Sequence, residues 1–167
     1  AESKPYGFMK FVPGIGVGGH CIPVDPTYLA FAANNVGAKA RFIEMANEVN
    51  LSMPTELVAR IKHDNGGSIQ GKKVIVHGIS YKPNIADIRE SPSLVLISSL
   101  RSEGALVSWH DSLVGDWNGE KSCDLESKAF DIGIVAIIHD VMDKSALLAS
   151  AKYVIDCTGK IKGAVKF

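Results

Sequence analysis

The stretch Lys73-Val74-Ile75-Val76-His77-Gly78 decides the fold class of this chain. Its run of β-branched residues ends at a glycine, which is typical of a short strand buried on both faces of a parallel sheet. Ser91-Pro92 follows and is expected to open an amphipathic helix. Apolar residues then recur at helical spacing until Gly104; they are Leu94, Val95, Ile97 and Leu100. A strand followed by an amphipathic helix is the first half of a β-α-β unit.

The same alternation continues toward the end of the chain. Residues 105–109 and 132–138 are predicted to be the second and third strands, residues 140–149 a helix, and residues 153–156 the fourth strand. Parallel strands need long crossover connections, which are usually helices. The sequence therefore predicts an α/β fold over residues 67–167, a doubly wound, Rossmann-like parallel sheet with helices on both faces.

The segment before this sheet, residues 26–66, is predicted to be helical. Asp25 can cap a first helix that opens at Pro26. A second, longer helix is expected over residues 40–61, kinked or restarted at Pro54, with an apolar stripe at helical spacing. The stripe comprises Phe42, Met45, Ala46, Val49, Met53, Leu57, Val58 and Ile61. A stripe of this size is typical of an interface, so we expect a homodimer with two-fold symmetry through the helix of residues 40–61.

Composition limits the partners and the compartment. The 167 residues balance 18 basic against 18 acidic side chains, and the basic ones are scattered, so no nucleic acid and no membrane surface is expected as a partner. No apolar run approaches the roughly 20 residues needed to span a bilayer. Cys21, Cys123 and Cys157 are odd in number and lack metal-ligand spacing, which favours a reducing, cytoplasmic compartment and predicts no metal site.

Residues 1–25 are predicted to form a glycine-rich loop. Gly14-x-Gly16-x-x-Gly19 matches the dinucleotide-binding fingerprint as a string, but its surroundings do not. The residues before it make a poor strand, and His20-Cys21-Ile22-Pro23 is expected to prevent a helix from starting. The other interpretation is that small residues let a large ligand lie close to the backbone, whose N–H groups suit an anionic or hydroxyl-rich ligand.

Cys21 stands at the end of this loop, and Asp25 follows four residues later. A thiol with a carboxylate nearby suits covalent acyl chemistry, in which sulfur attacks and the carboxylate positions or deprotonates water. The alternative is that Cys21 is a small buried hydrophobe in a turn. Spacing alone does not decide between the two interpretations.

Three segments in the same order resemble one known family. Residues 16–26 (Gly-Val-Gly-Gly-His-Cys-Ile-Pro-Val-Asp-Pro) resemble the nucleophile loop of the UDP-glucose/GDP-mannose dehydrogenase family. They are most similar to the branch that acts on UDP-N-acetylglucosamine or UDP-N-acetylmannosamine. Residues 47–54 resemble the family's central helix, which forms the subunit interface, and residues 77–92 resemble the signature of its UDP-binding domain. The collinear order makes the resemblance specific over about residues 11–111.

The resemblance implies an NAD-dependent enzyme of polysaccharide biosynthesis that oxidises the C6 hydroxyl of a UDP-sugar to a uronate, with two NAD⁺ and no metal. It implies that Cys21 attacks the C6 aldehyde to form a thiohemiacetal, that oxidation gives a thioester, and that Asp25 helps to organise the water that hydrolyses it. It implies an NAD contact by Arg89, which Asp87 orients. The implied substrate contacts are Phe11, Gly16, Gly18, Gly19, Tyr81 and Lys82.

Some of these residues have simpler interpretations. Arg89 can form a local ion pair with Asp87 or Glu90, and Lys82 can be a solvated surface side chain. Thr158 stands where the family usually has an arginine, and Lys160 is the candidate substitute. The remaining histidines, His63, His77, His110 and His139, are interpreted as structural.

The resemblance also places the family's NAD fingerprint and its proton-transfer residues before residue 1. We therefore expect a carboxyl-terminal part of the enzyme that gives no turnover alone. One alternative is a non-catalytic nucleotide-binding module. Another is a response-regulator-like or flavodoxin-like domain, for which Asp111 and Asp156 are too few to make an acidic cluster. A thiol enzyme that pairs Cys21 with His20 is disfavoured, because neighbours in an extended loop point apart.

Overall fold

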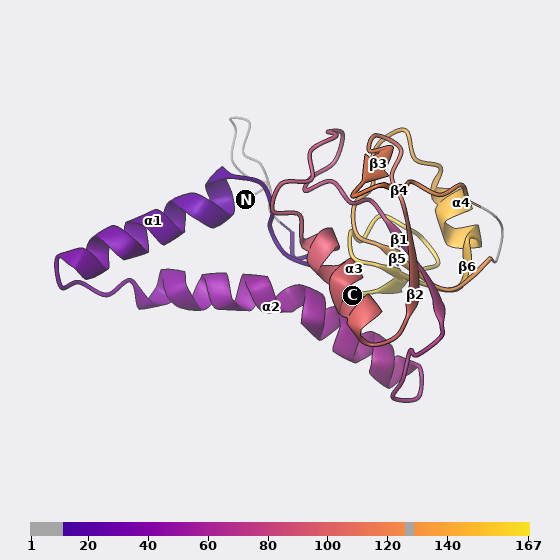
Figure 1. Cartoon of the computed structure of the whole chain (residues 1–167), viewed down its shortest axis with the longest axis horizontal. Helices are drawn as coiled ribbons and strands as arrows, with labels where there is room; N and C mark the ends of the chain where they lie inside the picture. The colour runs from indigo at the N-terminus through magenta and orange to yellow at the C-terminus, as the bar shows by residue number, and fades with distance from the viewer. Residues whose placement is uncertain (1–11, 126–128) are drawn as a thin grey trace.

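The computed structural model describes residues 12–125 and 129–167, so Phe11 lies outside the described residues. Figure 1 shows an α/β domain from which an arm of two antiparallel helices projects. The arm consists of α1 (Cys21–Asn35) and α2 (Arg41–Asp64), and the second half of α2 returns to the domain. No helix in the described part of the chain is long and apolar enough to cross a membrane.

The domain is built on a five-stranded, fully parallel sheet of order β2-β1-β5-β6-β7. Its strands are β1 (Lys73–His77), β2 (Leu106–His110), β5 (Phe130–Val135), β6 (Ala151–Asp156) and β7 (Val165–Lys166). Helix α3 (Pro92–Ser102) connects β1 to β2, and α4 (Lys144–Ala149) connects β5 to β6. The predicted α/β fold is therefore confirmed.

Each face of the sheet carries its own hydrophobic cluster, because successive side chains of a strand point to opposite faces. On one face, Val74, Val76, Ile132 and Ile134 pack with Leu57 and Ile61 of α2 and with Leu96, Ile97 and Leu100 of α3. On the other, Val135 and Val154 pack with Leu147 of α4. The predicted apolar stripe of α2 thus joins the core only in its second half, from Leu57 onward.

The prediction that no helix could start at His20–Pro23 is wrong, because α1 begins at Cys21 rather than at Pro26. Pro23 is the third helical residue, and the first four N–H groups of a helix have no partner within it, so proline costs little there. The loop predicted for residues 1–25 therefore ends at His20. In α2 the helix continues across the buried Pro54 as one element.

Two other expectations need correction. The helix predicted over residues 140–149 begins only at Lys144, because the Asp143 side chain accepts hydrogen bonds from Ser145 N and Ala146 N and caps it there. The strand predicted over residues 132–138 ends at Val135. Beyond it, the backbone N–H groups of residues 136 and 137 both donate to the His77 carbonyl, which turns the chain away from the sheet.

One element was missed, a hairpin of β3 (Asp116–Trp117) and β4 (Glu120–Lys121) between β2 and β5. Its two-residue turn, Asn118-Gly119, has φ values of 52° and 79°. Asn-Gly is the strongest short signal for such a turn, so the sequence did contain the information.

His77, at the end of β1, is fully buried and holds a proton poorly. Ser150 Oγ donates to the Leu147 carbonyl at 2.7 Å and lies 3.0 Å from His77 Nε2, so His77 Nε2–H is the donor of that second bond. His77 Nδ1 has no partner among the described residues. Burial, together with the neighbouring His110, lowers the pKa of His77 from 6.5 to about 3.

This lowered pKa predicts a loss of stability in mild acid. Between pH 6.5 and about pH 3 the unfolded chain takes up a proton at His77 that the folded chain refuses, so the contribution is absent above pH 6.5 and favours unfolding below it. His77→Gln keeps an N–H donor for Ser150 but cannot take up a proton. Between pH 7 and pH 5 we therefore expect the free energy of unfolding of this variant to fall by about 2 kcal/mol less than that of the wild type. Urea denaturation at several pH values measures this, with the exposed His63→Gln as control. If the free energy of unfolding falls equally with pH in H77Q and in the wild type, the lowered pKa of His77 is contradicted.

Candidate functional site

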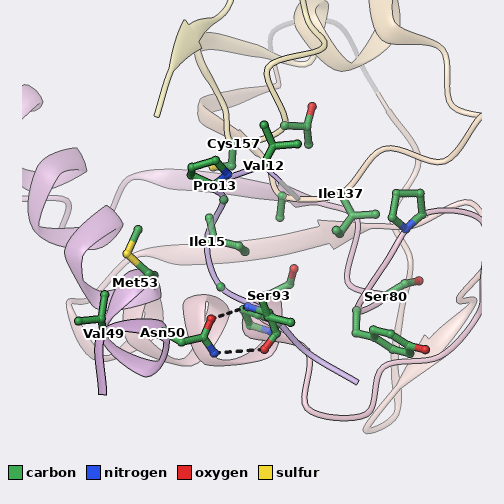
Figure 2. Close-up of a pocket in the computed structure, with 18 of the residues that line it drawn as sticks. Val12, Pro13, Ile15, Val49, Asn50, Met53, Ser80, Ser93, Ile137 and Cys157 are labelled. Carbon is green, nitrogen blue, oxygen red and sulfur yellow. Dashed lines mark hydrogen bonds between the residues drawn. The ribbon is translucent and has the colours of Figure 1, made fainter. Parts of the chain in front are cut away.

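A pocket of about 610 Å³ opens at the carboxyl edge of the sheet, between the sheet and α2. In Figure 2 its labelled side chains come from residues 12–15, from α2, from the start of α3 and from the loops that follow β1, β5 and β6. The chain passes from β1 outward to β2 on one side and returns to β5 on the other, so the strand order reverses beside β1. Open α/β sheets bind their ligands outside the carboxyl ends of the strands at such a point.

The walls of the pocket are mainly apolar. Its polar side chains are few: Asn50, Ser80, Tyr81, Ser93, Thr158 and Lys160. Most of them are already engaged, since the Ser93 hydroxyl donates to the Gly78 carbonyl at 2.9 Å and the Thr158 hydroxyl donates to Asp156 Oδ1 at 2.7 Å. The ammonium of Lys160 makes no hydrogen bond or ion pair with the described residues. An apolar pocket with a cation on its wall fits a nucleoside that carries phosphate.

The loop before α1 lies against the signature segment of residues 77–92, and its glycines are required by that packing. A side chain on Gly18 would collide with the Glu90 carbonyl, and a Cβ on Gly19 would lie 2.6 Å from the Tyr81 ring. Gly19 N also donates to the Arg89 carbonyl at 3.0 Å. Gly18 and Gly19 are buried by the chain itself, which gives them a structural role that the sequence did not reveal.

Cys21 and Asp25 both lie in the first turns of α1, and both are exposed. Residues four apart on a helix share one face, with Cβ atoms about 6 Å apart, so the fold places thiol and carboxylate side by side. The other two cysteines lie in less reactive surroundings. Burial raises the pKa of Cys157 to about 12, and burial also raises the pKa of Cys123. Cys21 is therefore the thiol best placed for chemistry.

Neither Cys21 nor Asp25 lines the pocket, whereas Gly16 and Tyr81 do. Gly18 and Gly19, beneath the Tyr81 ring, separate the pocket from the start of α1. The arrangement suits an extended ligand that is bound at one end in the pocket and reacts at its other end beside Cys21.

The charged residues predicted in the signature segment lie at its surface. Lys82 Nζ lies 5.5 Å from the centre of the Tyr81 ring, a cation–π contact. Arg89 pairs with Asp87, with Nη2 2.5 Å from Oδ2, and hydrogen bonds from Arg89 hold the pKa of Asp87 below its usual value. The simpler interpretation of Arg89, a local ion pair, is realised; the Arg89 side chain is 70% exposed, so the pair itself adds little stability.

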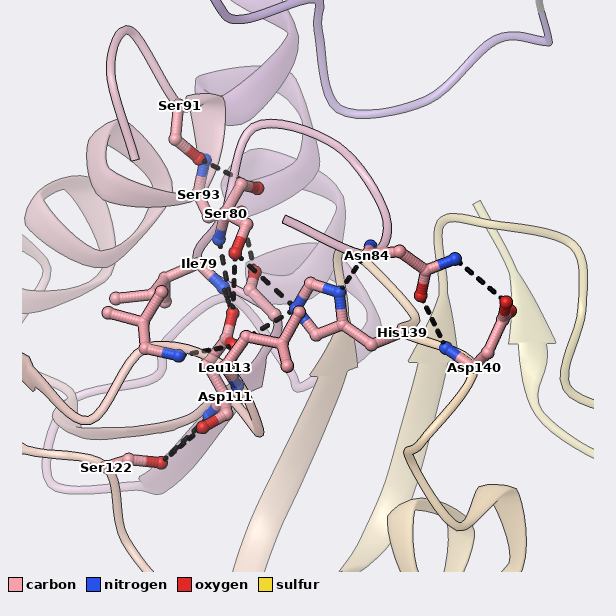
Figure 3. Close-up of polar contacts among 12 residues, drawn as sticks. Ile79, Ser80, Asn84, Ser91, Ser93, Asp111, Leu113, Ser122, His139 and Asp140 are labelled. Carbon is pink, nitrogen blue, oxygen red and sulfur yellow. Dashed lines mark hydrogen bonds and ion pairs between the residues drawn. The ribbon is translucent and has the colours of Figure 1, made fainter. Parts of the chain in front are cut away.

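A buried network that the sequence did not predict holds the loop after β1 (Figure 3). Asp111, which follows β2, is fully buried, and its carboxylate accepts from the N–H groups of Ile79, Ser80, Leu113 and Val114 and from the Ser80 hydroxyl. His139 Nε2 donates to Asp111 Oδ1 at 3.0 Å. Burial pushes the pKa of Asp111 up, but the hydrogen bonds from Leu113, His139 and Ile79 outweigh it, so the pKa lies below its usual value and the carboxylate stays charged.

His139 carries this network to the signature segment. Its Nδ1 accepts from Asn84 N at 2.8 Å, which fixes the neutral tautomer with the proton on Nε2. The Asn84 side chain in turn donates to Asp140 Oδ2 and accepts from Asp140 N, both at 2.8 Å. The interpretation of His139 as structural agrees with this arrangement, and its role is to tie the loop of residues 80–84 to the chain after β5.

Comparison with known families decides the identity of these parts. The UDP-binding domain of the UDP-glucose/GDP-mannose dehydrogenase family matches residues 75–163, and the central domain of the same family matches residues 1–52. The chain belongs to this family. The pocket is therefore shared by both matched domains: its walls from residues 12–17 and from the first half of α2 fall in the central domain, as does Cys21, and its walls from the loops after β1, β5 and β6 fall in the UDP-binding domain.

Individual relatives agree. The UDP-N-acetyl-D-mannosamine dehydrogenase of Methanocaldococcus jannaschii is 37% identical over 129 residues, which are 77% of this chain and 29% of that protein. The enzyme of the same name from Campylobacter jejuni is 43% identical over 93 residues, 56% of this chain and 22% of that protein. The structure of UDP-D-ManNAc dehydrogenase from Pyrococcus horikoshii aligns with a TM-score of 0.74 at 26% identity, covering 96% of this chain and 40% of that one. The chain thus spans less than half the length of these relatives.

The described residues do not fit the dinucleotide site that the glycine string suggests. Helix α1 opens two residues after Gly19, but no strand leads into the glycines from residue 12 onward, and Tyr81 and Glu90 fill the space beside Gly18 and Gly19. Arg89 remains the one predicted NAD contact. Within residues 12–125 and 129–167, no group of three or more His, Cys, Asp or Glu side chains could hold a metal ion.

Proposed function

We propose that this chain supplies the UDP site and the nucleophile of an NAD-dependent UDP-sugar 6-dehydrogenase. The observation that carries the proposal is the pairing of a pocket at the strand-order reversal with Cys21 and Asp25 on one face of α1. The relatives named above are UDP-N-acetylmannosamine dehydrogenases, which supports a UDP-N-acetylhexosamine as substrate. The NAD-binding part lies outside these 167 residues in this proposal, and the free cysteines suit a reducing, cytoplasmic compartment.

The chemistry of the chain's own residues follows from their placement. Cys21 Sγ bonds to the carbon of the C6 aldehyde while the carbonyl oxygen takes a proton, which gives a thiohemiacetal. NAD, when bound by the enzyme, supplies the hydride acceptor for the oxidations, and the second of these leaves a thioester on Cys21. Water then attacks the thioester carbonyl, Asp25 takes a proton from that water, and the C–S bond breaks to release the carboxylate and the free thiol.

The nucleotide end of the substrate is assigned to the pocket. Its apolar walls receive the base and ribose, and Gly16 and Tyr81 meet the ligand where they line it. Gly18 and Gly19 of the loop before Cys21 and Lys82 of the signature segment stay as predicted substrate contacts, and Arg89 of that segment stays as the predicted NAD contact. Lys160 takes the place of the family's arginine as a phosphate contact, because the neighbouring Thr158 hydroxyl is bound to Asp156.

Binding of UDP to the 167-residue chain tests the nucleotide site directly. We expect UDP to bind and Lys160→Ala to weaken it about 10-fold, the loss of one charge-assisted hydrogen bond. Isothermal titration calorimetry measures this, with Lys162→Ala, two residues away on the surface, as the matched control. Equal effects of K160A and K162A would exclude Lys160 as a contact, and the absence of any UDP binding would exclude the site.

Turnover tests the nucleophile. In the full-length enzyme we expect Cys21→Ser to abolish steady-state NADH formation from UDP-N-acetylmannosamine, because the second oxidation passes through the Cys21 thiohemiacetal. We expect Asp25→Asn to lower kcat by about 100-fold or more while a covalent adduct accumulates on Cys21. Spectrophotometry at the NADH absorbance and intact-protein mass spectrometry give the two readouts. Cys123→Ser is the control and should retain activity. A C21S enzyme with normal turnover would overturn the mechanism, as would NADH formation by the 167-residue chain alone.

We further propose that a second copy of the chain covers the helical arm. The face is apolar and exposed over both helices; its large exposed side chains outside the pocket include Tyr28, Leu29, Phe31, Val36 and Leu51. An exposed patch of this kind is typical of an interface, and most homo-oligomers pair such patches about a two-fold axis. The predicted homodimer through residues 40–61 would therefore include α1 as well.

Light scattering tests this proposal. We expect a mass of twice the 17.9 kDa chain, and a monomer for Leu51→Asp, because Leu51 is 70% exposed and its replacement leaves the core intact. Val95→Asp, at an exposed apolar position on α3, is the control and should remain dimeric. A wild-type monomer at micromolar concentration would contradict the interface.

A further inference from the structure

Two asparagines of α2 hold the chain on either side of the Cys21–Asp25 segment. Asn50 binds the loop that precedes Cys21 through two hydrogen bonds (Figure 2). Asn50 Oδ1 accepts from Val17 N at 2.7 Å, and Asn50 Nδ2 donates to the Val17 carbonyl at 3.3 Å. A side-chain amide thus satisfies both backbone groups of one residue, as a neighbouring strand would. Val17 lies four residues before Cys21.

Asn47 holds the other end. Its Nδ2 donates to Thr27 Oγ1 at 2.9 Å, and the Thr27 hydroxyl donates to the Pro23 carbonyl at 3.1 Å. Pro23 lies midway between Cys21 and Asp25 in the first turn of α1. A chain of two hydrogen bonds therefore runs from α2 to the backbone between the thiol and the carboxylate.

The two asparagines act from one surface of one rigid element. Positions 47 and 50 are three apart on α2, so their side chains lie on the same face. Packing contributes little on the α1 side, because the only buried residue of that helix is Ala30, well beyond the first turns. Polar ties rather than core packing fix the first turn of α1 against α2.

We propose that Asn47 and Asn50 are positioning residues that set the place of Cys21 and Asp25 relative to the nucleotide pocket. This inference rests on the proposed function, since it assigns the pair a part in the same reaction. Asn50 borders the pocket, but both ends of its amide are occupied by Val17, so it serves the loop rather than the ligand. Asn47 acts only through Thr27 and α1.

A positioning role for Asn47 and Asn50 predicts that their loss lowers the rate of the reaction more than it weakens substrate binding. Loss of the Asn47 tie leaves every pocket-lining residue in place, whereas loss of the Asn50 tie also frees Val17 on the pocket wall. Either loss lets the start of α1 shift, and small misplacements of reacting groups cost up to about 100-fold in rate. We expect Asn47→Ala and Asn50→Ala in the full-length enzyme to lower kcat by about 10- to 100-fold, with KM for the UDP-sugar near its wild-type value in Asn47→Ala, whose side chain does not line the pocket. A purely structural role would not divide kcat from KM in this way.

Matched controls make the test specific. Asn34 Nδ2 donates to Glu44 Oε1 at 3.3 Å, which joins the same two helices at the far end of the arm, so Asn34→Ala should leave kcat unchanged. Thr27→Val removes the hydroxyl at constant shape and should lower kcat as Asn47→Ala does. Thr27→Ser keeps the hydroxyl and should retain the wild-type kcat. Peptide-resolved hydrogen exchange of residues 16–27 should accelerate in N47A, N50A and T27V, and not in N34A.

The outcomes separate this inference from the proposed function. Faster exchange together with a selective loss of kcat supports it. Unchanged exchange in N47A and N50A overturns it, as does faster exchange with full kcat or an equal loss of kcat in N34A. A wild-type enzyme that lacks dehydrogenase activity would instead refute the proposed function and, with it, any part of the asparagines in that reaction, whatever the exchange shows.

Discussion

The charge of Asp111, buried beneath the carboxyl edge of the sheet, is the constraint on which the pocket depends. A buried carboxylate is tolerated only when its oxygens are saturated by donors, and here the donors come from the loops after β1, β2 and β5. Each donor fixes the backbone that carries it. The carboxylate therefore holds the three loops in fixed positions relative to one another. The hydrogen bond from Asn84 N to His139 extends this restraint to the signature segment.

The sequence predicted the repetitive part of this structure. Strands β1, β2, β5 and β6 and helix α3 have the periodicity of buried elements, and their places followed from that pattern within a few residues. The Asp111 network could not be predicted, because it joins residues as far apart along the chain as Asn84 and His139, 55 residues, and only the folded sheet brings them together. The start of α1 was missed for a different reason: proline was treated as a helix breaker in a first turn that tolerates it.

Part of the candidate site was likewise predicted from the sequence, and part is revealed only by the fold. Cys21 and Asp25 were identified by their spacing and by resemblance, and the helical start sharpens that identification by placing them on one face. The glycines before them were predicted to contact the substrate, and the structure adds that Gly18 and Gly19 pack against Tyr81 and Glu90. A loop glycine can signal close approach of any partner, and only the fold says whether that partner is a ligand or the chain itself.

Gly18 and Gly19 separate the pocket from Cys21, so the site can select a ligand by its length. Under the proposed function, a substrate whose base is held in the pocket reaches Cys21 Sγ only if the linker between base and sugar has the right length, and a diphosphate supplies a linker of fixed length. Selection by length requires no contact with the sugar's distinguishing groups. In that proposal, the residues that distinguish one sugar from another lie elsewhere in the enzyme, and the distance between the pocket and Cys21 is the same for every sugar.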